Sequence, residues 1–380
     1  MRSNLQQEMK ALGQTVLVLQ GGGALGAYQV GVYEALAEAG VEPDWVVGTS
    51  IGAINAGLIA GAPAGERVER LREFWRRVEH NHLFAQMLPG WLAGPTRSAL
   101  AATGGIPAFF EPNLRAFLGP YMPLGPEGAG YYTVERLRAT LAELIDFDEL
   151  NSGQVRLTVG ASNVRTSEMT YFDSRDMDLG LEHITASGAL PPAFPAVRIG
   201  DELYWDGGIL SNTPVEVVFD DNPRRNSLVF AVHIWNPHGP EPSCIWDVLN
   251  RQKDLQYSSR ANAHIQRQRQ IHRLRHIIAE LADMVPEGAR RGNAFGQMKG
   301  YGCTTRMHVV RLLAPSLEHE DHSKDIDFSP DGIRQRRDAG YRHTMQTLEQ
   351  APWRADADPL EGFVLHEACG GEMIETPAAA

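Results

Sequence analysis

A serine between two glycines is the residue of this sequence best placed for nucleophilic chemistry. Ser50 lies in Gly48-Thr49-Ser50-Ile51-Gly52, which fits the pattern G-x-S-x-G between a predicted strand and a predicted helix. In that context the serine occupies a sharp turn, and Gly48 and Gly52 let neighbouring backbone pass without a Cβ clash. Its hydroxyl then projects into a cleft at the amino terminus of a helix. The alternative is a serine that only caps the helix.

A glycine-rich turn comes one strand and one helix before this serine. Its sequence, Gly21-Gly22-Gly23-Ala24-Leu25-Gly26, follows the first predicted strand and opens the first predicted helix. Such a turn directs several backbone N–H groups into one concavity. We expect these donors to stabilise the oxyanion formed at an ester carbonyl, each contributing on the order of 3 kcal/mol. The expected oxyanion hole comprises Gly21, Gly22, Gly23 and Ala24, with Gly26 supporting the turn.

The same turn also fits a rival function. Gly21, Gly23 and Gly26 match G-x-G-x-x-G, and Asp44 follows at about the distance of a ribose-binding acid, which is typical of a dinucleotide-binding oxidoreductase. A lone match of this kind is weak evidence. Next to G-x-S-x-G on the following strand, an oxyanion hole explains more of the sequence.

A nucleophilic serine needs a base, and Asp206 is the candidate. It lies in Leu203-Tyr-Trp-Asp-Gly-Gly208, after a short predicted strand. Gly207 and Gly208 allow the chain to turn away while the carboxylate points into the site. The flanking Tyr204 and Trp205 would desolvate the carboxylate and raise its proton affinity. The alternative is an Asp-Gly turn of a hairpin with no chemical role.

A triad with histidine is the competing arrangement for the base. The chain order Ser, Asp, His would select Ser50, Asp206 and His233. His233 lies within an apolar run, however, where a histidine is more often a buried structural residue. His183 is a similarly weak candidate.

The elements that must position these residues repeat one pattern. A β-rich run at 15–19 is followed by a glycine turn and a helix at 27–39, and a second strand at 45–47 is followed by a helix at 51–60. This alternation predicts parallel strands with helices on both faces, an α/β fold. The uncharged run 45–65 is long enough to span a bilayer, but its glycines and polar residues favour a strand, a turn and a buried helix.

The composition changes along the chain and suggests its division. Residues 81–130 are apolar and rich in proline and glycine, which indicates an insertion or a lid over an apolar site, or equally a packed, loop-rich part of the core. Beyond residue 250 an apolar stripe predicts a helix, and residues 251–311 carry twelve basic against four acidic residues. The expected parts are an N-terminal segment (1–13), a hydrolase domain (14–236), a mostly helical C-terminal extension (237–369) and a disordered tail (370–380).

Charge and cysteine content limit the partners. The chain of 380 residues carries a formal charge of −12, so nucleic acid is not an expected partner. Its three cysteines fit neither a disulfide framework nor a zinc cluster, and the amino terminus lacks the pattern of a secretory signal. These features predict a cytoplasmic protein. The basic stretch suggests peripheral contact with an anionic membrane at its inner face, or homo-oligomerisation through the extension.

Taken together, four sequence blocks resemble the bacterial patatin-like phospholipases. They are Gly21 to Gly26, Gly48 to Gly52, Ala186-Ser-Gly-Ala-Leu-Pro-Pro-Ala-Phe-Pro195, and Asp206-Gly207-Gly208 with Asn212 and Pro214. The resemblance covers about residues 14–236 and implies a three-layer α/β/α sandwich around a mainly parallel sheet. It also implies a Ser-Asp dyad, here Ser50 and Asp206, that works without histidine, metal or cofactor. Leu25 departs from the arginine of many members, and the part after about Ser243 resembles the extension of a longer bacterial subgroup.

The expected activity is therefore hydrolysis of a lipid or other acyl ester through a covalent acyl-enzyme. A phospholipase A or a lysophospholipase-like esterase fits these features. An acyltransferase with the same nucleophile and a non-catalytic membrane-binding module remain the alternatives.

Overall fold

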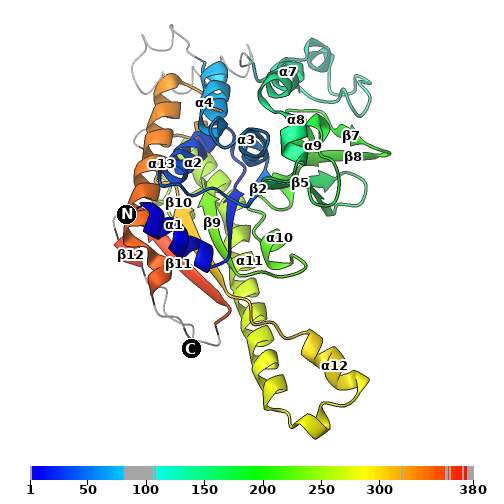
Figure 1. The fold of residues 1–380 in the computed structure, drawn as a ribbon. Helices are drawn as coiled ribbons and strands as arrows, with labels where there is room; N and C mark the ends of the chain where they lie inside the picture. Colours follow the sequence, from blue (N-terminus) through cyan, green and yellow to red (C-terminus); the bar gives the residue numbers. More distant parts are fainter. Residues whose placement is uncertain are drawn as a thin grey trace.

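A mixed β-sheet forms the centre of the molecule (Figure 1). The computed structural model describes residues 2–80, 106, 108–317, 320–355, 358, 361–369 and 372–374. Within these residues ten strands join the main sheet. They are β1 (Gln14–Leu19), β2 (Trp45–Thr49), β5 (Arg156–Asn163), β6 (Met169–Asp173), β7 (Val197–Ile199), β8 (Glu202–Asp206), β9 (Ser227–His233), β10 (Met307–Leu313), β11 (Phe363–Cys369) and β12 (Glu372–Ile374).

The strand order places β1 and β2 inside the sheet. It runs β12-β11-β10-β9-β1-β2-β5-β8-β7, with β6 paired to β5. The strands from β11 to β5 in this order run parallel, and β6, β7, β8 and β12 add antiparallel pairs. A separate pair is formed by β3 (Glu111–Pro112) and β4 (Tyr132–Thr133). The central strands are continuous apolar runs because both of their faces are buried, as the predicted parallel sheet requires.

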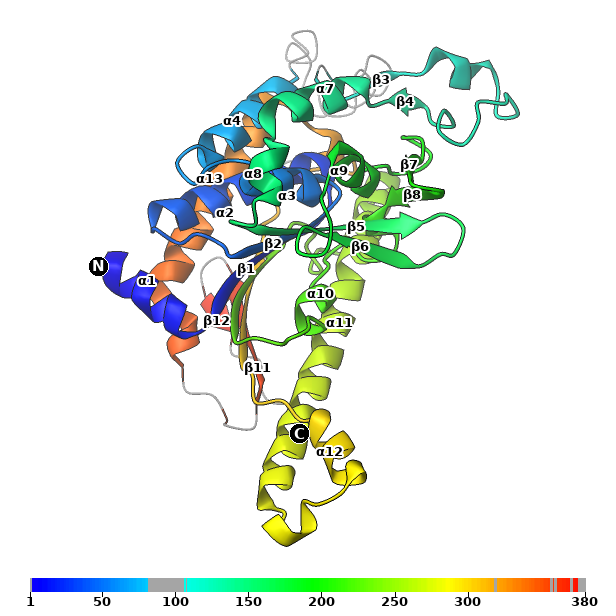
Figure 2. The same cartoon turned by 45° about the vertical axis from the view of Figure 1, so that its right-hand side comes forward.

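Helices cover both faces of the sheet (Figure 2). The helices are α1 (Arg2–Ala11), α2 (Ala27–Glu38), α3 (Ile51–Ala60), α4 (Arg67–Val78), α7 (Glu135–Leu144), α8 (Phe147–Asn151), α9 (Leu181–Ser187), α10 (Glu216–Phe219), α11 (Ile245–Met284), α12 (Asn293–Gly300) and α13 (Pro330–Gln350). Successive side chains of β1 point to opposite faces of the sheet and pack into two different apolar layers. Leu17 and Leu19 pack in the cluster with α2 and α3, whereas Val16 and Val18 pack with residues of α10 and α11. The molecule is thus a three-layer α/β/α sandwich, as predicted.

The C-terminal region is mainly helical, as expected, and it also completes the sheet. β10 pairs in parallel with β9, β11 pairs with β10, and β12 adds an antiparallel strand. The sequence analysis did not anticipate these strands. The second half of α11 and α12 project away from the sheet (Figures 1 and 2).

Two expected segments lie partly outside the described residues. Of the insertion or lid at 81–130, residues 81–105 and 107 are not described, whereas 108–130 are. Of the expected tail at 370–380, only Glu372–Ile374 is described, and it forms β12.

Candidate active site

Ser50 occupies a tight turn between β2 and α3. Its backbone has φ 57° and ψ −126°, a region that a residue with a Cβ rarely adopts and that costs on the order of 1–3 kcal/mol. The turn is held from outside, because the Ser50 N–H donates to Ser187 Oγ at 3.0 Å. Ser187 in turn donates to the Gly160 carbonyl at 2.6 Å. The strain is therefore offset by contacts from α9 and β5.

The two glycines of this turn allow backbone to approach closely. A Cβ on Gly48 would lie 2.3 Å from the Gly52 carbonyl oxygen, and a Cβ on Gly52 would lie 2.2 Å from the carbonyl oxygen of Leu19. Both separations are too short for any side chain. The spacing G-x-S-x-G thus follows from how closely α3 packs on β1 and β2.

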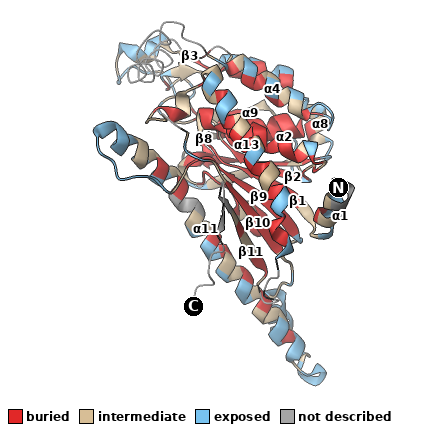
Figure 3. Ribbon diagram, turned by 90° about the vertical axis from the view of Figure 1, so that its left-hand side faces the viewer, coloured by how far each residue is buried: buried red, intermediate tan, exposed pale blue. Residues whose placement is uncertain are grey.

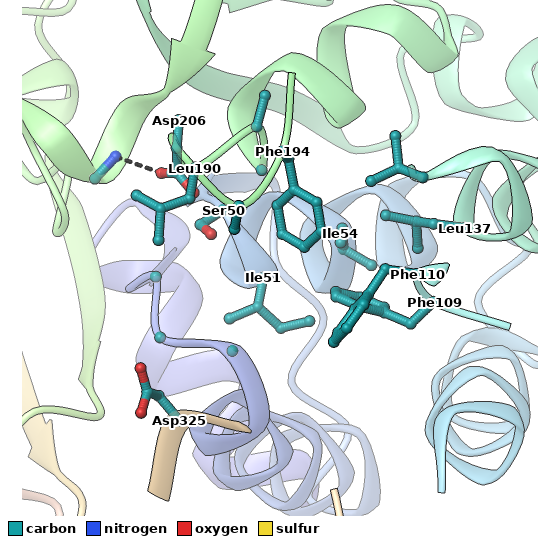
Figure 4. Close-up of a pocket in the computed structure, with 18 of the residues that line it drawn as sticks. Ser50, Ile51, Ile54, Phe109, Phe110, Leu137, Leu190, Phe194, Asp206 and Asp325 are labelled. Atoms are coloured by element: carbon teal, nitrogen blue, oxygen red, sulfur yellow. Dashed lines mark hydrogen bonds between the residues drawn. The ribbon is translucent and has the colours of Figure 1, made fainter. Parts of the chain in front are cut away.

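Asp206 lies at the end of β8 and faces Ser50 (Figure 4). Asp206 is 2 % exposed, and its carboxylate faces the Ser50 side chain, which acts to lower the pKa of this carboxyl group. The carboxylate also accepts the Gly208 N–H at 2.6 Å. Burial raises the pKa of Asp206 to about 7, because desolvation disfavours the charged form more than the Ser50 side chain and the Gly208 N–H favour it.

Close backbone packing also positions this carboxylate. A Cβ on Gly207 would lie 2.3 Å from the Gly160 carbonyl oxygen, and one on Gly208 would lie 2.7 Å from Asn212 Oδ1. The turn after Asp206 therefore packs directly on β5.

The glycine turn lies on the other side of Ser50. Gly21 is fixed in place: its N–H donates to the Asn212 carbonyl at 3.1 Å, and its own carbonyl accepts from Asn212 Nδ2 at 3.0 Å and Trp235 Nε1 at 2.8 Å. Gly22 and Gly23 line the same pocket as Ser50 and Asp206. Gly23 has φ 56°, and a Cβ there would lie 2.2 Å from the Asp325 carbonyl oxygen. Ala24 and Gly26 continue this turn as the buried start of a 3₁₀ helix (Gly23–Gly26) that leads into α2.

Gln20 is a buried residue of the site that sequence reasoning missed. Its Oε1 accepts the N–H groups of Ile234 at 2.6 Å and Trp235 at 3.0 Å. Its Nε2 donates to Thr213 Oγ1 at 2.6 Å and to the Tyr257 carbonyl at 3.2 Å. Gln20 thereby ties the start of the glycine turn to β9 and α11. The only sequence signal was a polar residue directly after the first apolar strand.

The candidate histidines lie apart from this constellation. His233 is fully buried in β9, and neither ring nitrogen has a hydrogen-bond partner among the described residues. Its burial, together with Arg311, holds the pKa of His233 well below its ordinary value, so the ring is neutral. His183 accepts the Gly180 N–H at 2.8 Å at the start of α9. Neither histidine lines the pocket that holds Ser50.

The pocket beside Ser50 and Asp206 is a largely apolar cavity of about 200 Å³. One wall comes from α3 and the segment after the undescribed residues, with Ile51, Ile54, Phe109 and Phe110. Another wall comes from the C-terminal region, including Tyr257, Asp325, Ile326 and Phe328. In Figure 4 Asp325 lies on one side of Ile51 and Phe109 and Phe110 on the other. The two walls meet where the Phe109 and Phe328 rings lie with centroids 5.5 Å apart. Both halves of the chain therefore build this pocket.

Comparison with known families identifies the class of protein. Residues 17–219 match the family model described as patatin-like phospholipase, which is more than half of the chain. Residues 255–360 match a second model, described as patatin phospholipase. The chain belongs to the patatin-like phospholipase family, and its C-terminal extension has a counterpart within it.

Individual relatives are similar over part of their length. An uncharacterized NTE family protein of Mycobacterium tuberculosis is 29 % identical over 206 residues, which is 54 % of this chain and 28 % of the relative. The lysophospholipase NTE1 of Debaryomyces hansenii is 25 % identical over 234 residues, 62 % of this chain and 12 % of the relative. This chain thus spans less than a third of these relatives. The crystal structure of VipD from Legionella pneumophila aligns with a TM-score of 0.37 and 16 % identity, covering 89 % of this chain and 67 % of that one.

The described residues contain neither a bilayer-spanning helix nor a metal-binding cluster. No described helix combines the length and apolar character that crossing a bilayer requires. The described His, Cys, Asp and Glu side chains form no group of three or more that could hold a metal ion.

Proposed function

We propose that the chain is a lipid acyl hydrolase, a phospholipase A or lysophospholipase-like esterase, that works through a Ser50–Asp206 dyad. The observation that carries this proposal is the placement of the Ser50 side chain against the buried Asp206 carboxylate, in the pocket that the glycine turn also lines. Membership of the patatin-like phospholipase family supports it.

In the first step Ser50 attacks the ester. Its Oγ forms a bond to the carbonyl carbon, the hydroxyl proton passes to Asp206, and the carbonyl electrons move onto oxygen. The raised pKa of Asp206 suits this step, because a carboxylate with an ordinary pKa is a weak proton acceptor.

The backbone N–H groups of Gly22 and Gly23 stabilise the resulting oxyanion, with Ala24 next along the turn. The described residues provide no hydrogen-bond acceptor for the first two groups. Gly21 has a different role from the one expected, because its N–H already donates to the Asn212 carbonyl. It anchors the turn.

Collapse of the intermediate breaks the bond between the carbonyl carbon and the alcohol oxygen, which takes the proton from Asp206. A water molecule then attacks the acyl carbon while Asp206 accepts its proton. The bond between that carbon and Ser50 Oγ breaks, Oγ takes the proton back from Asp206, and the carboxylic acid leaves. The apolar pocket beside Ser50 holds the acyl chain through Ile54, Phe110, Leu137 and Phe194.

Three substitutions test the dyad. Ser50→Ala and Asp206→Asn should each lower kcat by roughly 10³-fold or more, since they remove the nucleophile and its base. His233→Asn should keep most turnover per folded molecule, since His233 lies outside the pocket. Hydrolysis is measured with phospholipids, lysophospholipids and simple acyl esters, and covalent labelling with a fluorophosphonate reports on Ser50.

Thermal unfolding of each variant serves as the control for folding. Turnover that survives Ser50→Ala would remove the proposed nucleophile. Loss of turnover in folded His233→Asn as well as in Asp206→Asn would replace the dyad by a triad.

A further inference from the structure

Two exposed apolar segments, which we call the rim, extend from two different walls of the pocket. The first follows β3, where Leu114 is 78 %, Leu118 73 % and Tyr121 96 % exposed. The second is the first turn of α11, where Ile245 is 74 % and Trp246 53 % exposed. Large apolar side chains this exposed and this close together in the chain are unusual on a surface that only faces water.

The first rim segment is attached to the aromatic wall of the pocket. Asn113 closes its base by donating from its N–H to the Tyr131 carbonyl at 2.8 Å and from Nδ2 to the Gly130 carbonyl at 2.9 Å. On either side of this base, Phe110 and Tyr132 line the pocket with ring centroids 4.8 Å apart. The segment is therefore a closed loop whose base is part of the pocket wall.

The second rim segment is attached to the wall that the C-terminal region supplies. Lys253 Nζ binds both carboxylate oxygens of Asp325, at 2.7 and 2.9 Å, and Asp325 lines the pocket. The Trp246 ring stacks on His322 with centroids 4.1 Å apart. The start of α11 and the segment around Asp325 thus form one unit. In Figure 3 this end of α11 and the segment after β3 extend on the same side of the molecule.

The rim carries little charge. Arg115 is the single charged residue between 113 and 126. Asp247, in the first turn of α11, accepts hydrogen bonds from the Ser243 hydroxyl at 2.7 Å and the Cys244 N–H at 3.2 Å. In the basic stretch after residue 250, by contrast, Lys253 binds Asp325, and Arg269 binds Glu361 at 2.6 Å. Attraction to an anionic surface through this stretch is correspondingly reduced.

We infer that the rim docks on a lipid surface and holds the pocket against it, an inference that rests on the proposed lipid hydrolase function. Transfer of the exposed side chains into the acyl region supplies the binding free energy. A protein seated on both segments would cover the pocket between their walls, whereas a lipid layer in the same place supplies acyl chains to it. Because the rim is apolar, binding depends little on anionic lipid and on salt.

The test compares a rim variant with a matched variant far from the pocket. The rim variant combines Leu114→Asp, Leu118→Asp and Ile245→Asp. The control combines Leu281→Asp and Met284→Asp, whose side chains are also exposed, at 57 % and 73 %, but lie on the projecting end of α11. Each is made with Ser50→Ala and sedimented with vesicles of phosphatidylcholine, alone or mixed with phosphatidylglycerol.

We expect the rim variant to bind both kinds of vesicle at least tenfold more weakly than the Ser50→Ala parent, and the control to bind like the parent. The inference would be overturned if the rim variant bound vesicles as well as the parent, or if the parent bound no vesicles. It would also be overturned if only the control lost vesicle binding. A parent that is dimeric by light scattering and becomes monomeric on rim substitution would assign the surface to a second copy of the chain instead.

A second readout separates this inference from the proposed function. With Ser50 restored, the rim variant should hydrolyse a short, water-soluble acyl ester as fast as the unsubstituted chain does and lose turnover only on vesicles. A different outcome is that the rim substitutions weaken vesicle binding while the unsubstituted chain hydrolyses no ester. In that case the docking surface stands and the proposed chemistry fails.

Discussion

At the scale of single residues, Asp206 determines how the site responds to pH. Its carboxyl group is buried, so desolvation raises its pKa to about 7 despite the opposing effects of the Ser50 side chain and the Gly208 N–H. A base must be ionised to accept a proton. Activity should therefore be lost as the pH falls below this pKa, and buried His233, whose pKa lies well below its ordinary value, should contribute nothing to the profile.

The expected profile of kcat/KM, measured with a water-soluble ester, rises about tenfold per pH unit below the pKa of Asp206 and levels off above about pH 7. Rates are compared with thermal unfolding at each pH so that loss of fold is not mistaken for protonation. A rate that stays constant down to about pH 5 would contradict the raised pKa.

The same pKa makes a prediction for stability. Because the folded state binds the Asp206 proton more tightly than the unfolded state, this group destabilises the fold as the pH rises from about 4 through 7. Asp206→Asn removes that dependence. The free energy of unfolding of this variant, relative to that of the unsubstituted chain, should rise by up to about 4 kcal/mol from low to neutral pH. Chemical unfolding at both pH values measures it, and a difference independent of pH would exclude the linkage.

The two residues of the proposed dyad leave a clearer pattern in the sequence than the residues that hold them in place. Ser50 and Asp206 stand in motifs whose glycines are required by close backbone approach, so the chemistry leaves a pattern in the sequence. Gln20 and Ser187 act through hydrogen bonds to backbone groups distant in sequence, at Ile234 and Ser50. Only the folded chain brings those partners together.

At the scale of elements, helices α2 and α13 pack through a glycine on each side. A Cβ on Gly31 would lie 1.8 Å from the Arg337 carbonyl oxygen, and one on Gly340 would lie 2.1 Å from that of Tyr28. The Tyr28 hydroxyl and His343 Nδ1, 2.6 Å apart, join the same helices. This contact fixes the C-terminal region on the helix that follows the glycine turn.

Gly340→Ala should therefore lower the free energy of unfolding by about 1–3 kcal/mol, because the helices must separate to admit the methyl group. The matched control is Gly296→Ala in α12, where a Cβ meets nothing within 4 Å. It should leave stability unchanged or raise it by up to about 1 kcal/mol. Equilibrium unfolding in urea measures both, and equal effects would show that the contact is not tight.

Elements with a strong local pattern were predicted well, and the others were not. The helix at 51–60 was predicted with the bounds of α3, because a glycine turn and an apolar run delimit it. The stripe on α11 predicted the helix but not its burial, since Leu274 and Leu281 are exposed. Strand β10 was missed because its short apolar run follows a long helical region, and its pairing with β9 is not encoded locally.

At the scale of the whole molecule, one sheet joins the two halves of the chain. β9 lies between β1 and β10, so every strand from β10 to β12 depends on the edge that β9 provides. The C-terminal region also supplies one wall of the pocket and the helix that covers α2. The hydrolase domain expected at 14–236 and the extension therefore share a core, although their sequences match separate family models.

A fragment ending at residue 236 should consequently aggregate and lack ester hydrolysis. It would expose the backbone of β9, whose seven residues are all buried in the full chain, and an unpaired apolar edge promotes association between molecules. It would also lose Tyr257 and Asp325 from the pocket.

Replacing only residues 280–301 by a short linker should keep the chain soluble and active, because that projecting part contributes neither strand nor pocket residue. Soluble yield, size-exclusion chromatography and turnover of a water-soluble ester distinguish the two deletions. A monomeric fragment 1–236 with full turnover would mean that the two halves are energetically independent despite their common sheet.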